Sequence, residues 1–148
     1  MSAQMRKLSS SVEVKLDGNV IHEILKDRPN DISRVSQLVS SVELCDGQWG
    51  KAGSVVRWNF STPDGKKFSS KERVEVIDDA KKSLTWRVLE GDVKALYSNF
   101  AFIMNVEKAG ENKSLVTWTM EYEKHDESIP EPHGILEYCL IITKDIEA

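Results

Sequence analysis

Apolar residues recur at every second position through most of the chain, from about Leu38 to Tyr122. A period of two is typical of β-strands with one buried face, whereas a helix repeats every three to four residues. Turn-forming groups interrupt the pattern, among them Pro-Asp-Gly at 63–65 and Gly-Glu-Asn at 110–112. Because such short spacings suit hairpins rather than strand–helix–strand crossovers, we expect six successive antiparallel strands in this region.

The two ends of the chain add one more strand and the helices. Residues 8–16 (LSSSVEVKL) alternate as a half-buried strand, and 20–27 (VIHEILKD) and 31–36 (DISRVS) follow as two short helices after polar capping residues. From Pro132 onward, apolar residues recur at steps of three and four, which predicts a long amphipathic C-terminal helix. The expected fold class is therefore α+β, with a seven-stranded curved antiparallel sheet wrapped around this helix.

Composition limits the partners of the chain. With 148 residues, 40% hydrophobic and 30% charged, we expect a single domain spanning 1–148. The net charge of −4 offers no basic surface, so we expect neither nucleic acid nor an anionic membrane as a partner. The first residues lack the apolar run of a signal peptide, and no later stretch approaches the roughly 20 apolar residues of a membrane span, so we expect a cytoplasmic protein.

Metal and nucleotide cofactors are not expected. Cys45 and Cys139 are the only cysteines, and neither they nor the three histidines have the spacing of a metal site, so we expect two reduced thiols and no metal. The glycine loop at 47–53 does not match a phosphate-binding loop, because Lys51 is followed by Ala52 and then by a strand. We read it as a tight loop between strands.

One face of the predicted sheet carries large apolar side chains, and the opposite face is polar. The candidate lining from the strands is Val56, Trp58, Phe60, Phe68, Ser70, Leu84, Trp86, Val88, Phe100, Phe102, Val116, Trp118 and Met120. The inner stripe of the terminal helix adds Ile135, Cys139 and Ile142. The same alternation places Val74 and Val76 on the apolar face.

A single long helix leaves much of this apolar face uncovered. A twisted sheet around one helix tends to leave space, and an internal cavity of about 300 to 1,000 Å³ there would have to hold water or a ligand. The alternative is that the aromatic face packs solidly against the helix, because apolar stripes are usually core.

Glu72 is the most informative single residue, because alternation places its carboxyl on the apolar face between Ser70 and Val74. An unpaired buried carboxyl is costly and has a raised pKa. It could hydrogen-bond a ligand or act as a general base while Ser70 positions the substrate. The alternative is a β-bulge that turns Glu72 outward to pair with Lys71 or Arg73.

Two further side chains are candidates for a role in chemistry. Tyr138 on the terminal helix can pack its ring while its hydroxyl serves a ligand. His22 on the first short helix could reach one end of the cavity, although surface and capping roles are commoner for such a residue. With Glu72, these are the three tentative catalytic residues, whereas Cys139 is expected to be a small core residue.

Several strings, in the same order along nearly the whole chain, resemble the plant major latex protein family. They are DGQWGKAGSV at 46–55, KERVEVID at 71–78, TWRVLEGD at 85–92, TWTMEYEK at 117–124 and ITKDIEA at 142–148. That family lies within the birch-pollen-allergen superfamily, beside the pathogenesis-related class-ten proteins. The resemblance implies the same helix-grip fold and a large internal cavity.

The resemblance also implies two functions that the residues leave open. The first is binding of a hydrophobic or amphipathic plant metabolite, for carriage, storage, defence or specialised metabolism, by a monomer or weak dimer. The second is a cofactor-free cyclase or isomerase that shapes a reactive terpenoid or alkaloid intermediate. The scarcity of polar groups on the predicted inner face favours binding.

Overall fold

The computed structural model describes residues 4–147, which form one seven-stranded antiparallel sheet with helices against it. The strands lie in the order β1-β7-β6-β5-β4-β3-β2, so β2 to β7 form a continuous meander and β1 joins it beside β7. Their bounds are β1 (Arg6–Val14), β2 (Val39–Asp46), β3 (Val55–Ser61), β4 (Lys67–Asp78), β5 (Ser83–Gly91), β6 (Tyr97–Gly110) and β7 (Lys113–Lys124). The predicted α+β fold class is confirmed.

The helices are α1 (Gly18–Asp27), the 3-10 helix η1 (Pro29–Arg34), α2 (Asp92–Leu96) and α3 (His133–Glu147). Asp17 caps α1 by accepting a hydrogen bond from the backbone N–H of Asn19 at 2.8 Å. Both predicted short helices are present, the second as η1. The short helix α2 was not predicted, because Gly91 and Asp92 indicated only a turn. None of the helices in residues 4–147 has the length and apolar character needed to cross a membrane.

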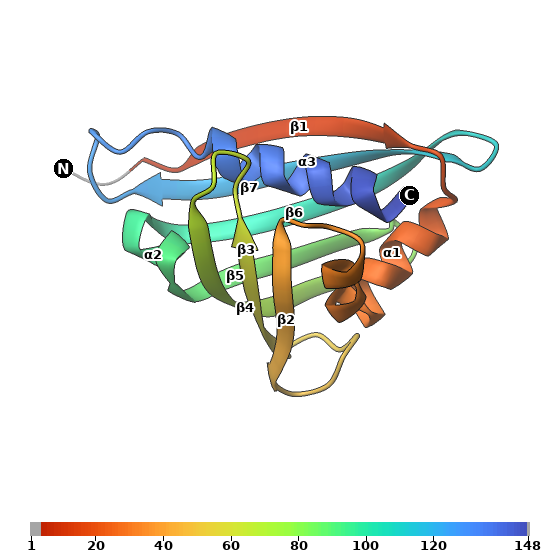
Figure 1. Cartoon of the computed structure of the whole chain (residues 1–148), viewed down its shortest axis with the longest axis horizontal. Helices are drawn as coiled ribbons and strands as arrows, with labels where there is room; N and C mark the ends of the chain where they lie inside the picture. Colours follow the sequence, from red (N-terminus) through yellow and green to blue (C-terminus); the bar gives the residue numbers. More distant parts are fainter. Residues whose placement is uncertain (1–3, 148) are drawn as a thin grey trace.

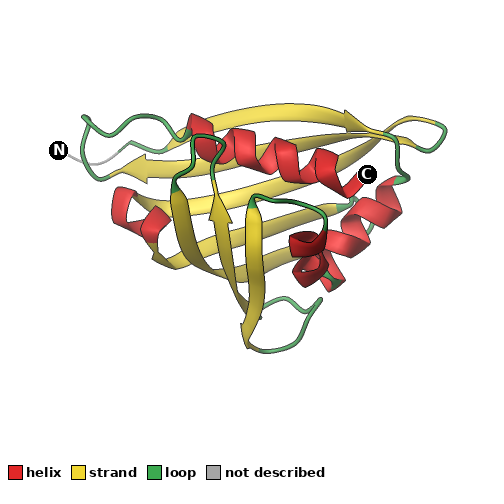
Figure 2. Cartoon of the chain, in the orientation of Figure 1, coloured by secondary structure: helices red, strands yellow, loops and turns green. Residues whose placement is uncertain are grey.

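Helix α3 lies along β1 and β7, and α1 and η1 lie at one end of the sheet (Figures 1 and 2). Polar contacts tie α3 to these two strands: Lys144 Nζ donates to the carbonyl of Glu13 at 3.0 Å, and Trp118 Nε1 donates to Thr143 Oγ1 at 2.8 Å. Toward β3, α3 makes an aromatic contact, in which the rings of Tyr138 and Phe60 stack with centroids 4.1 Å apart. The helix is therefore fixed along one side of the sheet and packed by side chains on the other.

The predicted alternation holds in most strands but changes within β4. Val74 pairs with Trp86 and Val76 pairs with Thr85, so Glu75 is an extra residue that forms a β-bulge. A one-residue insertion exchanges the two faces of a strand. Val76 is consequently 47% exposed, and the prediction that it lies on the apolar face is wrong.

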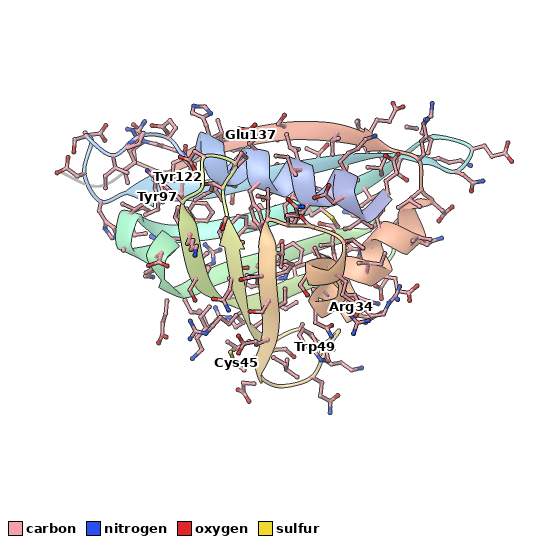
Figure 3. The ribbon with its side chains drawn as sticks, in the orientation of Figure 1. Arg34, Cys45, Trp49, Tyr97, Tyr122 and Glu137 are labelled. Atoms are coloured by element: carbon pink, nitrogen blue, oxygen red, sulfur yellow. The ribbon has the colours of Figure 1, made fainter. Side chains whose placement is uncertain are left out.

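A polar cluster fixes the loop that leads into α3. The Tyr122 hydroxyl donates to Glu131 at 2.6 Å, Lys124 forms an ion pair with the same carboxylate, and the Tyr97 hydroxyl donates to the carbonyl of Pro130 at 2.6 Å. Tyr97 and Tyr122 lie side by side at this end of the molecule (Figure 3), with ring centroids 5.4 Å apart. Lys124, followed by Tyr122, holds the pKa of Glu131 below its usual value.

We predict that Glu131→Gln destabilises the protein at neutral pH by about 1 to 2 kcal/mol, because it weakens charge-assisted bonds from Lys124 and Tyr122. A lowered carboxyl pKa stabilises the fold above the unfolded-state pKa, and this contribution is lost as pH falls through the folded-state pKa. The difference from wild type should therefore close in acid. Urea unfolding across pH measures it. Glu127→Gln, which alters a carboxylate that is 78% exposed, is the control and should change little.

We also predict that Gly91→Ala is much more destabilising than Gly53→Ala. Both glycines have positive φ, +112° and +90°, which costs other residues about 1 to 2 kcal/mol. A Cβ at Gly91 would also lie 2.1 Å from the carbonyl oxygen of Ser69, whereas a Cβ at Gly53 meets nothing within 4 Å. Urea unfolding should show a loss of about 3 kcal/mol or more at Gly91 and about half that at Gly53. Equal losses would contradict this reading of the β5–α2 junction.

Candidate ligand-binding site

A small apolar cavity lies between α3 and the inner face of the sheet, with a volume of about 20 Å³. Strands β3 to β7 supply six of its lining residues, and α3 supplies the other three. The lining residues are Trp58, Phe60, Glu72, Trp86, Phe102, Trp118, Tyr138, Cys139 and Ile142. All nine are among the residues that the sequence proposed for ligand binding or catalysis.

The predicted large cavity is wrong for this structure, because 20 Å³ holds about one water molecule. The aromatic side chains fill the space themselves: Trp86 stacks on Trp118 with centroids 5.6 Å apart, and Phe60 stacks on Tyr138. At roughly 24 cal/mol per Å³, a void of this size costs only about 0.5 kcal/mol, whereas 300 Å³ would cost about 7 kcal/mol. The alternative of close packing between helix and sheet describes this arrangement better.

The remaining proposed lining residues lie outside this cavity wall. Most are buried in the surrounding core, and Phe68 is half-buried beside Phe60, with ring centroids 5.3 Å apart. The set is Val56, Phe68, Ser70, Leu84, Val88, Phe100, Val116, Met120 and Ile135. These side chains pack behind or beside the lining, so alternation identified the inner face correctly but not which part of it borders the cavity.

Glu72 faces inward and is only 4% exposed. It pairs with Val56 on β3 and Val88 on β5. The β-bulge beside it has its extra residue, Leu89, in β5 and not in β4, so Glu72 keeps the inward orientation that alternation along β4 predicts. The proposed outward turn toward Lys71 or Arg73 is therefore wrong. Those two cations pair elsewhere on the outer face, Lys71 with Glu90 and Arg73 with Glu75.

Burial raises the pKa of Glu72 to about 8, and the nearby Ser70 hydroxyl acts in the opposite direction. At neutral pH the side chain is therefore mainly a carboxylic acid, which can donate a hydrogen bond as well as accept one. Burial also raises the pKa values of Tyr138 and Cys139 well above their usual range. The titratable groups of the cavity are thus uncharged at neutral pH.

One polar atom of the cavity wall, Trp58 Nε1, is buried without a hydrogen-bond partner in the described part of the chain. Trp58 and Ser70 sit directly opposite each other on β3 and β4. By contrast, the indole N–H of Trp118 in the same cavity is satisfied by Thr143. An unsatisfied buried donor costs about 1 to 3 kcal/mol, so this side of the cavity has unmet hydrogen-bonding capacity.

The structure does not bring His22 to the cavity with Glu72 and Tyr138. His22 Nε2 lies 2.9 Å from Asp79 Oδ1, and Lys26 Nζ lies 3.1 Å from the same oxygen. These contacts connect α1 to the turn between β4 and β5. His22 is buried there among structural contacts.

Sequence reasoning missed Thr143. Its hydroxyl accepts the hydrogen bond from Trp118 and donates one to the backbone carbonyl of Cys139 at 2.7 Å. The available signal was its position four residues after Cys139, on the same side of the helix. Trp49, in the loop after β2, is half-buried against the core and lies toward the bottom of Figure 3, away from α3.

Comparison with known proteins identifies the group to which this fold belongs. The family model for the pathogenesis-related protein Bet v 1 family matches residues 3–148. The chain belongs to the Bet v 1 family. Bet v 1 family members generally bind hydrophobic ligands.

The chain resembles the major latex proteins within the Bet v 1 family. It is 36% identical to MLP-like protein 43 of Arabidopsis thaliana, over 99% of this chain and 93% of that one. The crystal structure of ginseng major latex-like protein 151 from Panax ginseng has a TM-score of 0.90 and 37% identity, covering 97% and 95% of the two chains. A solution structure of an Arabidopsis thaliana member of the major latex protein family has a TM-score of 0.69 and 34% identity, covering 97% and 92%.

We predict that Glu72 makes the stability of the protein fall as pH rises. A carboxyl whose folded-state pKa lies above its unfolded-state value binds more protons when folded, so stability is lost between the usual carboxyl pKa of 4.5 and about 8. Glu72→Gln should abolish this loss and be a few kcal/mol more stable than wild type near pH 8. Urea unfolding at several pH values measures the slope.

Glu75→Gln provides the matched control for that experiment, because Glu75 lies on the outer side of the same strand. Arg87 is the main cause that lowers the pKa of Glu75, so removing this charge should destabilise the protein at neutral pH. If Glu72→Gln leaves the slope of stability against pH unchanged between pH 4.5 and 8, the conclusion that Glu72 is protonated at neutral pH is contradicted.

Proposed function

We propose that this protein binds a hydrophobic or amphipathic small plant metabolite between α3 and the inner face of the sheet. The observation that carries the proposal is a cavity lined by aromatic side chains, with a buried carboxyl, Glu72, and an indole N–H, Trp58, that has no hydrogen-bond partner within residues 4–147. An apolar wall with few polar groups is typical of small-molecule sites. Membership of a family that generally binds hydrophobic ligands supports the same conclusion.

Binding requires the cavity to expand, because its present volume of about 20 Å³ is too small for any metabolite of this class. The side of α3 that faces β3 is the place for such a change. There the stack of Tyr138, Phe60 and Phe68 is held by ring packing, and Phe68 at its outer end is half-buried. Rotation of these rings would enlarge the cavity while the polar ties from Trp118 and Lys144 hold α3 on β7 and β1.

We further propose that the protein acts as a single-domain, cytoplasmic carrier or storage protein, as a monomer or weak dimer. A ligand enclosed in this way is shielded from water, but its binding breaks aromatic contacts within the protein. The affinity then reflects the difference between the contacts the ligand makes and the ring contacts it displaces.

The neutral fluorescent probe N-phenyl-1-naphthylamine tests the site directly. We predict weak saturable binding to wild type and about tenfold tighter binding to Phe60→Ala, which removes a ring from the cavity wall and opens space. Trp49→Ala is the control: Trp49 is also an aromatic residue packed against the core, but it is only half-buried and lies outside the wall, so its loss should leave probe affinity as in wild type. Absence of saturable binding to both wild type and Phe60→Ala would refute the proposed function.

One observation favours an enzymatic alternative, because Glu72 is a buried carboxylic acid that could protonate a carbonyl oxygen of a bound intermediate. A simple probe is the acid-promoted cyclisation of citronellal to isopulegol, an isomerisation that needs no cofactor. Gas chromatography should show no product above background for a pure binding protein. Product formation that disappears in Glu72→Gln would support the cyclase instead.

A further inference from the structure

Two polar groups of the cavity wall, the Trp58 indole N–H and the Glu72 carboxyl, come from the neighbouring strands β3 and β4, and α3 adds the Tyr138 hydroxyl and the Cys139 thiol. Trp58 Nε1 can only donate, and it is buried without a partner among the described residues. Ser70 lies opposite Trp58 in the pairing of β3 with β4, and Glu72 is two residues along the same face of β4. Diagonal neighbours across a strand pair lie about 7 to 8 Å apart at the backbone, within reach of long side chains.

The cavity wall has no positive charge to balance an anion. Within residues 4–147, none of the side chains that line it is lysine or arginine. The cations nearest along β4, Lys71 and Arg73, pair with Glu90 and Glu75 on the outer face. A carboxylate or phosphate placed beside Glu72 would be a buried charge without a partner, which is strongly unfavourable.

We propose that the ligand is an uncharged molecule whose carbonyl oxygen accepts hydrogen bonds from the Trp58 indole N–H and the Glu72 carboxyl group. This inference rests on the proposed function and specifies the substrate class of that same site. A carbonyl oxygen has two lone pairs and can accept from both groups at once. Ketones, aldehydes, esters and lactones with an apolar frame satisfy this requirement, whereas free fatty acids and phosphates do not.

The protonation state of Glu72 links this recognition to pH. The groups that face Glu72 are Val56 and Trp58 from β3, Val88 and Trp86 from β5, and Tyr138 and Cys139 from α3. The last two are the titratable members, and burial holds their pKa values well above the usual range, so they stay neutral. Loss of the Glu72 proton above about pH 8 therefore removes a donor and adds a negative charge beside the carbonyl oxygen.

Three ligands of nearly equal size separate the chemical classes: 2-acetylnaphthalene, 2-ethylnaphthalene and 2-naphthoate. Each is titrated against the protein saturated with N-phenyl-1-naphthylamine, and displacement of the probe gives its affinity. At about pH 7 we expect the ketone to bind about tenfold tighter than the hydrocarbon, and the carboxylate to bind most weakly. The preference for the ketone over the hydrocarbon should fall as pH rises through about 8.

Two tryptophan variants form a matched pair for this comparison. Trp58→Phe removes the N–H that has no partner among the described residues, and it should abolish most of the tenfold preference for the ketone. Trp118→Phe removes an N–H that already donates to Thr143, so it should change ketone and hydrocarbon binding by the same factor. Glu72→Gln, which keeps a donor at all pH values, should make the preference independent of pH.

The outcomes distinguish this inference from the function on which it rests. If the hydrocarbon displaces the probe but the ketone binds no tighter, or if 2-naphthoate binds as tightly as the ketone at pH 7, the carbonyl site is overturned and the binding function stands. An equal effect of Trp58→Phe and Trp118→Phe on the preference also overturns it. If the probe itself does not bind, the proposed function fails first.

Discussion

Trp118 on β7 donates its indole N–H to Thr143 on α3, and this bond ties the terminal helix to the sheet where both are fully buried. The arrangement of the site depends on this position of α3 on the sheet. With α3 held along β1 and β7, the inner ends of the aromatic side chains from β3, β5 and β6 meet the helix instead of water. The cavity is what remains between a helix fixed on one side and rings that approach from the other.

Two opposing costs shape this site. A large void would destabilise the fold by several kcal/mol, so the rings of Phe60, Tyr138, Trp86 and Trp118 fill it. Filling the space with rings leaves the indole N–H of Trp58 without a partner among residues 4–147, and it keeps Glu72 protonated by burial. A ligand with an apolar frame and one acceptor oxygen would replace the ring contacts and also satisfy that N–H. The closed cavity thus fits the proposal that it expands only when a ligand of this kind binds.

Much of the fold could be predicted from local pattern. Alternation and turn residues predicted seven antiparallel strands, and the three- and four-residue steps after Pro132 predicted α3. One error lies where pairing between strands overrides alternation, because the bulge at Glu75 exposes Val76. Another is α2, which follows Gly91 where the sequence indicated only a turn. A bulge is decided by the register of two strands, and one strand's sequence does not contain that information.

The same division applies to the site. The sequence by itself determined that Trp58 lies on the apolar face of its strand and Tyr138 on the apolar stripe of its helix, because the side-chain periods of strand and helix require it. For Glu72 it left an inward and an outward orientation open. Only the tertiary structure decided that the rings close the space to about 20 Å³ and that His22 belongs to a contact with Asp79. It also decided that the indole N–H of Trp118 is paired while that of Trp58 has no partner in the described part of the chain. The physical reason is that periodicity specifies a direction for each side chain, whereas volume and hydrogen bonding depend on what approaches from the opposite layer.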